Sequence, residues 1–344
     1  MSAFRYRPWG LLPWVIHKCP DLRWGFIGSF WTEERGLSAW RTLNGLGKLS
    51  STYFANIVEP PSRFTLESDE ILAKRKKEYE GYGGSLSDIY DHLLFDRVGD
   101  IVNTMDRIID NAGPNIVLDI SSLPKRFFFP FVKLLIKATS IDNLIVVYTL
   151  PRAHTDNLAE NYQDWNTLPL FQGVYPDLPT KMLIVSVGYL AMGLSDQIEQ
   201  DNPHLALKIL FPFPPGPPSF QKTLELVRLI KKNLKTDRLE LIRVNAVDTP
   251  DAYDLILAHT QQGELAANFA PFGPKPISLA MAIYAAANDR PVFYNQPKTY
   301  HPKYSIGVSD INGIPETYAY CIRINGHDFY DTQVSGREGV GPVI

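Results

Sequence analysis

The sequence contains only two cysteines, Cys19 and Cys321, among 344 residues. Two thiols this far apart cannot form a disulfide framework or a zinc ribbon, and a reducing compartment is their usual setting. The first residues lack the basic and then apolar pattern of a secretory leader, and the apolar stretch from Gly10 to Ile16 is interrupted by Pro13. That stretch is far shorter than the roughly 20 residues that span a bilayer. We therefore expect a soluble, cytoplasmic protein with no membrane partner.

An excess of positive charge is also missing, because the formal net charge is −3 and the pI is near 6.2. Proteins that coat nucleic acid depend on clustered Lys and Arg. The densest basic run, Lys74 to Lys77, falls on a predicted helix, where a solvated face is the simpler interpretation. Direct DNA binding is not expected.

The common catalytic, metal and cofactor motifs are absent as well. The seven histidines show no metal-ligand spacing, and no Gly-x-Ser-x-Gly elbow occurs. Neither Gly-x-x-x-x-Gly-Lys-Ser/Thr nor Gly-x-Gly-x-x-Gly is present. The sequence therefore predicts no metal and no cofactor, and it identifies no catalytic residue by motif.

What the chain does contain is an internal repeat. Pro-Pro-Ser begins at Pro60 and again at Pro217, an offset of 217 − 60 = 157 residues. The Pro-Lys step at 124–125 returns at 274–275, with 274 − 124 = 150, and Pro151-Arg152 matches Pro297-Lys298, with 297 − 151 = 146. Ordered landmarks with a slowly drifting offset, in a chain long enough for about two domains, indicate two diverged copies of one unit. We expect one lobe at residues 1–160 and the other at 161–344.

Each half alternates apolar runs typical of buried strands with amphipathic stretches typical of helices, which predicts parallel βαβ units. The expected strands are residues 24–30, 54–58, 116–120 and 144–148, and then 183–187, 206–210, 239–244, 265–269 and 292–294. The expected helices are residues 37–46, 66–79, 89–108, 127–138, 222–234 and 277–287. Because the first half shows no obvious third strand, we expect it to be the more divergent copy.

Asn325-Gly326 stands between two strand-like runs, which is a strong hairpin signal. The predicted fold class is therefore α/β. It consists of two tandem Rossmann-like parallel-sheet lobes related by internal duplication, with a C-terminal β-hairpin.

Both Pro-Lys steps fall between a strand and the next helix. Open parallel sheets bind ligands at this edge, and helix N-termini there present N–H groups to anions. We expect Lys125 and Lys275 to neutralise phosphate, although a rigid turn with a solvated lysine is the alternative for each. The other candidate ligand-binding residues are Ser121, Ser122 and Arg126 in the first turn and Gly273 and Ser278 in the second.

The same edge offers positions for further roles. Glu59, Arg152 and Lys298 follow strands at its outer parts, where ribose or base contacts are expected. Asp119 ends a strand beside the first Pro-Lys turn, and His301 is the one histidine expected near this edge. Asp119 is interpreted either as a cap of the turn or as a proton carrier. His301 is interpreted either as a packed structural histidine or as a proton carrier.

The repeated unit of strand, lysine-bearing turn and helix carries a resemblance. The turns read Ser121-Ser122-Leu123-Pro124-Lys125 and Pro271-Phe272-Gly273-Pro274-Lys275. This arrangement resembles the CRISPR-associated Rossmann-fold sensor domains of bacterial antiviral systems and their fused double relatives. The resemblance lies in the topology of both halves. It implies binding of a cyclic oligonucleotide between two units and output through a separate effector protein.

Three functional hypotheses follow. The first is a binding module for a nucleotide or another phosphorylated small molecule, of the sensor type. The second is an enzyme acting on a nucleotide or sugar phosphate, with Asp119 or His301 moving a proton. The third is a structural subunit that docks a protein partner in a defence or toxin complex.

Overall fold

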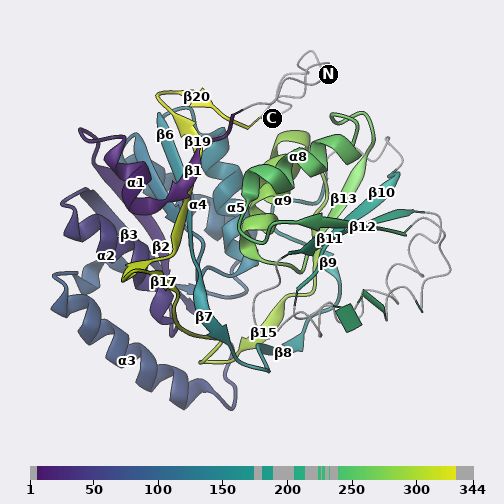
Figure 1. Cartoon of the computed structure of the whole chain (residues 1–344). Helices are drawn as coiled ribbons and strands as arrows, with labels where there is room; N and C mark the ends of the chain where they lie inside the picture. Colours follow the sequence, from purple (N-terminus) through teal and green to yellow (C-terminus); the bar gives the residue numbers. More distant parts are fainter. Residues whose placement is uncertain are drawn as a thin grey trace.

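The computed structural model describes residues 6–173, 180–188, 205–213 and 239–330, together with Leu224, Glu225, Val227, Arg228 and Lys232. The helix expected over 222–234, the repeat landmark at 217–219 and the C-terminal tail lie largely or wholly outside these residues. Two sheets stand side by side, with helices between and around them (Figure 1). The fold is mixed α/β with predominantly parallel sheets.

The first sheet contains five parallel strands in the spatial order β4-β3-β2-β5-β6. Their bounds are β2 (Trp24–Phe30), β3 (Leu49–Val58), β4 (Ile89–Leu93), β5 (Asn115–Asp119) and β6 (Asn143–Thr149). All residues of β2 and β6 are buried, as expected for strands covered on both faces. Two further strands extend the sheet beyond β6: β19 (Thr317–Ile324) pairs antiparallel to β6, and β1 (Trp9–Leu11) pairs antiparallel to β19.

The second sheet contains four parallel strands in the order β12-β11-β10-β13. Their bounds are β10 (Met182–Ser186), β11 (Ala206–Pro212), β12 (Leu239–Val244) and β13 (Ala267–Pro271). A parallel bridge from Phe269 to Val292 adds the start of a fifth position beside β13. Counted along the chain within each half, both sheets follow the order 3-2-1-4, and the next segment lies beside the fourth strand in both. This is the strand order of a Rossmann-like half.

The first half does contain a third strand, so the expectation that it lacks one was wrong. Residues 89–93 form β4, which pairs with β3, and the helix expected from residue 89 begins only at Val98. Ile89 and Leu93 are four residues apart, a spacing that fits both one face of a helix and one face of a strand. Pairing with β3 makes residues 89–93 a strand, and the local periodicity of the sequence could not distinguish a strand from a helix here.

The helices of the first half are α1 (Leu12–His17), α2 (Ser38–Gly45), α3 (Thr65–Gly81), α4 (Val98–Ala112) and α5 (Lys125–Lys137). Those of the second half are α8 (Thr249–His259), which the sequence analysis did not predict, and α9 (Lys275–Asn288). Asp248 caps α8 by accepting from the main-chain N–H of Asp251 at 2.8 Å.

Helices α5 and α9 pack against each other between the two sheets (Figure 1). Every residue of α9 from Pro276 to Ala286 is buried, the pattern of a helix with neighbours on all sides. A single buried apolar cluster includes Phe128 of α5, Tyr284 of α9 and residues of both sheets. The two halves therefore share a hydrophobic core.

Two connecting segments join the halves and run antiparallel to each other. The outgoing strands are β7 (Pro151–His154), β8 (Ala159–Tyr162) and β9 (Asn166–Thr167), and they pair with β16 (Ser305–Val308), β15 (Pro297–Tyr300) and β14 (Phe293–Tyr294). The returning chain passes through β17 (Asp310–Ile311) and β18 (Ile314–Pro315). It then enters the first sheet as β19.

This return differs from the expected lobe boundaries. Residues 317–324 were assigned to the second lobe, but the structure places them in the first sheet between β1 and β6. After β19, Asn325 and Gly326 have φ values of 49° and 73°, and β20 (His327–Asp328) pairs back onto β19.

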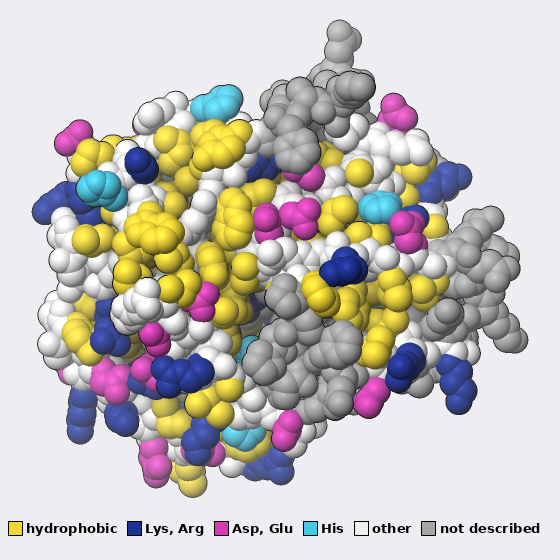
Figure 2. All heavy atoms as spheres, in the orientation of Figure 1, with side chains coloured by type: hydrophobic (Ala, Val, Ile, Leu, Met, Phe, Trp, Pro, Cys, Tyr) yellow, Lys and Arg dark blue, Asp and Glu magenta, His cyan; other side chains and the backbone are white. Residues whose placement is uncertain are grey.

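No helix in the described ranges is long and apolar enough to cross a membrane. On the face seen in Figure 2, Lys and Arg are scattered among Asp and Glu instead of forming one basic patch.

Candidate functional site

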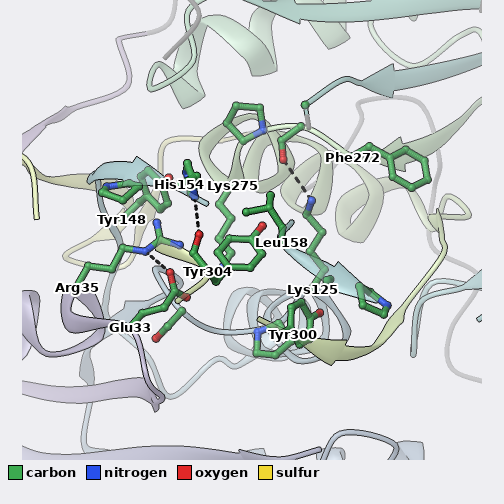
Figure 3. Close-up of a pocket in the computed structure, with 18 of the residues that line it drawn as sticks. Glu33, Arg35, Lys125, Tyr148, His154, Leu158, Phe272, Lys275, Tyr300 and Tyr304 are labelled. Atoms are coloured by element: carbon green, nitrogen blue, oxygen red, sulfur yellow. Dashed lines mark hydrogen bonds and ion pairs between the residues drawn. The ribbon is translucent and has the colours of Figure 1, made fainter. Parts of the chain in front are cut away.

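A cavity of about 400 Å³ lies where the carboxyl ends of the two sheets face each other, with the connecting strands along one side (Figure 3). Both halves contribute to its wall. Its charged or titratable lining residues are Glu33, Arg35, Glu59, Lys125, Tyr148, Arg152, His154, Tyr162, Lys275, Tyr294, Tyr300 and Tyr304. Small-molecule sites typically occupy cavities of roughly 300–1,000 Å³.

The two Pro-Lys turns have almost the same backbone geometry. Pro124 has φ −57° and ψ 148°, and Pro274 has φ −54° and ψ 148°. Each proline precedes the first residue of a helix, and that residue is a lysine in both turns. Proline fixes φ in this range, so the local sequence sets each lysine at the start of its helix.

Each lysine reaches across to the opposite turn. Lys125 Nζ donates to the carbonyl oxygen of Gly273 at 3.2 Å, and Lys275 Nζ donates to the carbonyl oxygen of Ser121 at 2.7 Å. The Lys125 ammonium also lies 5.2 Å from the ring centroid of Tyr294. Among the residues described, no ion pair joins either lysine to a carboxylate.

Burial without a counter-ion destabilises the charged form of an amine. It lowers the pKa of Lys125 to about 7. It also lowers the pKa of Lys275 well below its usual range, and the charges of Arg35 and Lys125 act in the same direction, while Glu33 opposes them. An anion in the cavity would supply the charge that both ammonium groups lack.

Glu33 and Arg35 form a buried ion pair beside the cavity. Arg35 Nε donates to Glu33 Oε2 at 2.8 Å, and Arg35 Nη1 donates to the carbonyl of Thr149 at 3.3 Å. The hydroxyl of Ser305 also donates to Glu33. Burial would raise the pKa of Glu33, but Arg35, Lys275 and the Ser305 hydrogen bond outweigh it and hold that pKa below its usual value. Arg35 is paired with Glu33, and Arg152 with Asp310 at 3.6 Å, so Lys125 and Lys275 are the lysine and arginine side chains of the wall without an acidic partner in the described structure.

Asp119 lies behind the first turn with 2% of its surface exposed. Its Oδ1 accepts from the main-chain N–H of Ser121 at 2.8 Å, while Oδ2 has no hydrogen-bond partner among the described residues. Burial raises the pKa of Asp119 to about 6, although the Ser121 hydrogen bonds and the charges of Lys275 and Arg35 lower it. This carboxyl group could exchange a proton near neutral pH.

The structure brings four of the seven predicted site residues to the cavity: Ser122, Lys125, Gly273 and Lys275. The Ser122 hydroxyl donates to the carbonyl of Ser29 at 3.1 Å, so its hydrogen is used within the fold. Gly273 allows a close approach, since a Cβ there would lie 2.8 Å from the Cβ of Ser186.

The other three side chains do not reach the cavity wall. The Ser121 hydroxyl accepts from the main-chain N–H of Thr149 at 2.8 Å. Arg126 turns to the outer side of α5, where Nη2 donates to the carbonyl of Asp96 at 3.0 Å. Ser278 is fully buried and its hydroxyl donates to the carbonyl of Pro274 at 3.1 Å. These three side chains stabilise the turns and the helix that carry the lysines.

His301 also lies away from the cavity. Its ring packs on Phe64 with centroids 4.8 Å apart, and its Nδ1 accepts from the main-chain N–H of Lys303 at 3.0 Å. The histidine in the wall is His154, whose pKa burial lowers to about 4, helped by Arg35 and opposed by Glu33. A neutral His154 adds no charge to the site at neutral pH.

Sequence reasoning missed Glu33, Arg35, His154 and the tyrosines of the connecting strands. Tyr294, Tyr300 and Tyr304 recur over a short polar stretch, which is the one signal that could have drawn attention to them. No group of acidic, histidine or cysteine side chains that could hold a metal ion occurs in the described part of the chain.

Comparisons with known proteins identify no relative that assigns a function. No family model matches the chain, and no curated protein matches it. A functionally unknown protein of Pseudomonas aeruginosa is similar at 12% identity, over 82% of this chain and 95% of that one, with a TM-score of 0.23. A universal stress protein of Archaeoglobus fulgidus is similar at 9% identity, over 79% and 96%, also with a TM-score of 0.23. Scores this low carry no conclusion about function.

Proposed function

We propose that this protein binds a nucleotide or another phosphorylated small molecule in the cavity between its two halves. One observation carries the proposal: Lys125 and Lys275 face the same cavity, are buried or half-buried, and have no acidic partner in the described structure. A phosphate provides the negative charge and the several acceptors that two ammonium groups need. Each lysine also begins a helix, whose N-terminus favours an anion.

We further propose that the halves descend from one duplicated unit. Shared strand order, matching proline dihedral angles and reciprocal lysine bonds support this origin. A ligand on the axis relating the halves would meet one lysine from each. This geometry suits a ligand with two phosphates at least as well as one with a single phosphate.

The sensor role in an antiviral system, with a separate effector protein, belongs to the same proposal. It rests on the resemblance of the paired lysine turns to the CRISPR-associated Rossmann-fold sensors. Its physical support is that the lysines facing the ligand also bond the opposite half. Ligand binding would therefore compete with a contact between the halves.

Isothermal titration of the full chain with inorganic phosphate, mononucleotides and cyclic dinucleotides tests the proposal. The comparison is wild type against Lys275→Met, with Lys77→Met on the exposed face of α3 as the matched control. Loss of a charge-assisted hydrogen bond should weaken binding about tenfold or more in Lys275→Met and leave Lys77→Met unchanged. No binding to wild type, or equal affinity in the two variants, would overturn the site.

Incubating the protein with the same ligands and analysing for product examines the enzyme alternative. Its candidate proton carrier, Asp119, lies behind the first turn, and Oδ2 of that residue has no partner among the described residues. Product formation that disappears in Asp119→Asn would make the cavity a catalytic site. Saturable binding without product would support the binding module.

A further inference from the structure

We infer that the cavity has a base-recognition end built around Glu59 and that it selects guanine. This inference rests on the proposed function, because it assigns the base of a ligand whose phosphate meets the lysines. Glu59 would be the specificity-determining residue, and the hydrogen-bond donors of the guanine base would be the groups that it recognises.

Glu59 follows directly after β3 and lines the cavity. Its two oxygens share one donor, the main-chain N–H of Tyr300, at 3.2 and 3.1 Å. No Lys, Arg or His forms an ion pair with it in the described structure. A carboxylate has about four acceptor positions, so most of those on Glu59 remain for a ligand. Burial raises the pKa of Glu59 to about 8, because few donors surround its carboxyl group. Donors on a ligand would favour the ionised form and restore the full set of acceptor positions.

A second acceptor lines the same cavity. Asn295 donates through Nδ2 to the carbonyl of Gln163 at 3.2 Å, and its buried Oδ1 has no partner among the described residues. Acceptors on Glu59 and Asn295 call for donors on the ligand. Guanine presents adjacent donors, N1–H and the N2 amino group, whereas the corresponding edge of adenine carries an acceptor at N1.

Aromatic rings provide the faces for such a base. Tyr162, Tyr294, Tyr300 and Tyr304 line the cavity on the side of the connecting strands, and the Tyr300 and Tyr304 centroids are 6.1 Å apart. Figure 3 shows Tyr300 and Tyr304 in the same cavity as the two lysines. Bases stack on such rings whatever their identity, so the rings supply affinity and the acceptors supply selectivity.

The sheet sets a suitable separation between the two ends. Glu59 follows β3 and Lys125 follows the turn after β5, and β2 lies between these strands. Two inter-strand spacings give about 10 Å between the strand ends. A nucleotide lying across the end of β2 could place its phosphate at the lysines and its base at Glu59.

The test is titration calorimetry with guanosine, inosine and adenosine monophosphates, cyclic di-GMP, cyclic di-AMP and inorganic phosphate. Wild type should bind the guanine member of each series about tenfold or more tightly than the adenine member, the scale of a paired base contact. Inosine, which lacks the N2 amino group, should fall between them. Glu59→Gln keeps an acceptor for the Tyr300 N–H, so it should fold, retain phosphate binding and lose the guanine preference.

Glu34→Gln is the matched control, because Glu34 is exposed and does not line the cavity. Equal affinity of wild type for guanine and adenine ligands would overturn the guanine assignment and leave the phosphate site standing. A guanine preference that survives in Glu59→Gln would overturn the role of Glu59. Absence of all nucleotide and phosphate binding would overturn the proposed function, and this inference with it.

Discussion

Lys275 donates a hydrogen bond to the main-chain carbonyl of Ser121 at 2.7 Å, although 154 residues separate them in the chain. Lys125 makes the reverse connection to Gly273 at 3.2 Å, across 148 residues. Each lysine thus stabilises the turn from which the other one starts. Because these ammonium groups also face the cavity, we expect a bound anion to alter the contact between the halves.

The first prediction concerns the stability cost of burying Lys125. Its pKa in the folded protein is about 7, against 10.5 for an ordinary lysine. Between these values the unfolded chain holds one proton more, so this group makes the free energy of unfolding increase as pH rises from about 7 toward 10. The destabilisation is largest below pH 7.

Lys125→Met should therefore be more stable than wild type at pH 6 by about 1 kcal/mol or more, with a smaller difference at pH 9. Urea denaturation of the ligand-free protein at both pH values measures this, with Lys77→Met as the exposed control. A difference that does not change with pH would show that the Lys125 ammonium is not destabilised by burial.

The second prediction concerns the close approach at Gly273. An added Cβ would lie 2.8 Å from the Cβ of Ser186 and 3.1 Å from the carbonyl oxygen of Val187. Gly273→Ala should lower the free energy of unfolding by about 1–3 kcal/mol, the cost of overpacking, and weaken phosphate binding because the turn must shift.

Gly45 provides the comparison, since it ends α2 with nothing within 4 Å of an added Cβ. Gly45→Ala should be neutral or slightly stabilising. Thermal denaturation of both variants settles the point. Equal stability of the two alanine variants would contradict the close packing of Gly273 against Ser186.

The third prediction concerns the buried pair of Glu33 and Arg35, whose side chains are 4% and 2% exposed. Arg35→Met leaves the Glu33 carboxylate buried without its main partner, which should cost about 3–5 kcal/mol. Glu33→Gln in the same chain removes that charge, so the double variant should lose less than the sum of the single variants. A double-mutant cycle by urea denaturation measures the coupling, and strict additivity would contradict the pairing.

The sequence alone determined several of the local elements of this protein, although not β4 or α8. Buried strands such as β2 and β6 are recognisable as continuous apolar runs, and the helices after the two Pro-Lys turns were predicted from residues 127 and 277, two residues after the observed starts of α5 and α9. These features depend on neighbours in the chain, so pattern and propensity suffice to predict them. The lysines at the cavity followed from the same reasoning.

Only the tertiary structure decided which side chains face the cavity and which strand joins which sheet. Arg126 was expected beside Lys125, but one residue further along a helix turns a side chain by about 100°, toward Asp96 instead. Glu59 meets Tyr300 across 241 residues, and Ser305 meets Glu33 across 272. Such contacts cannot be predicted from the local sequence, because they form only when β15 pairs with β8 and β16 pairs with β7 in the folded protein.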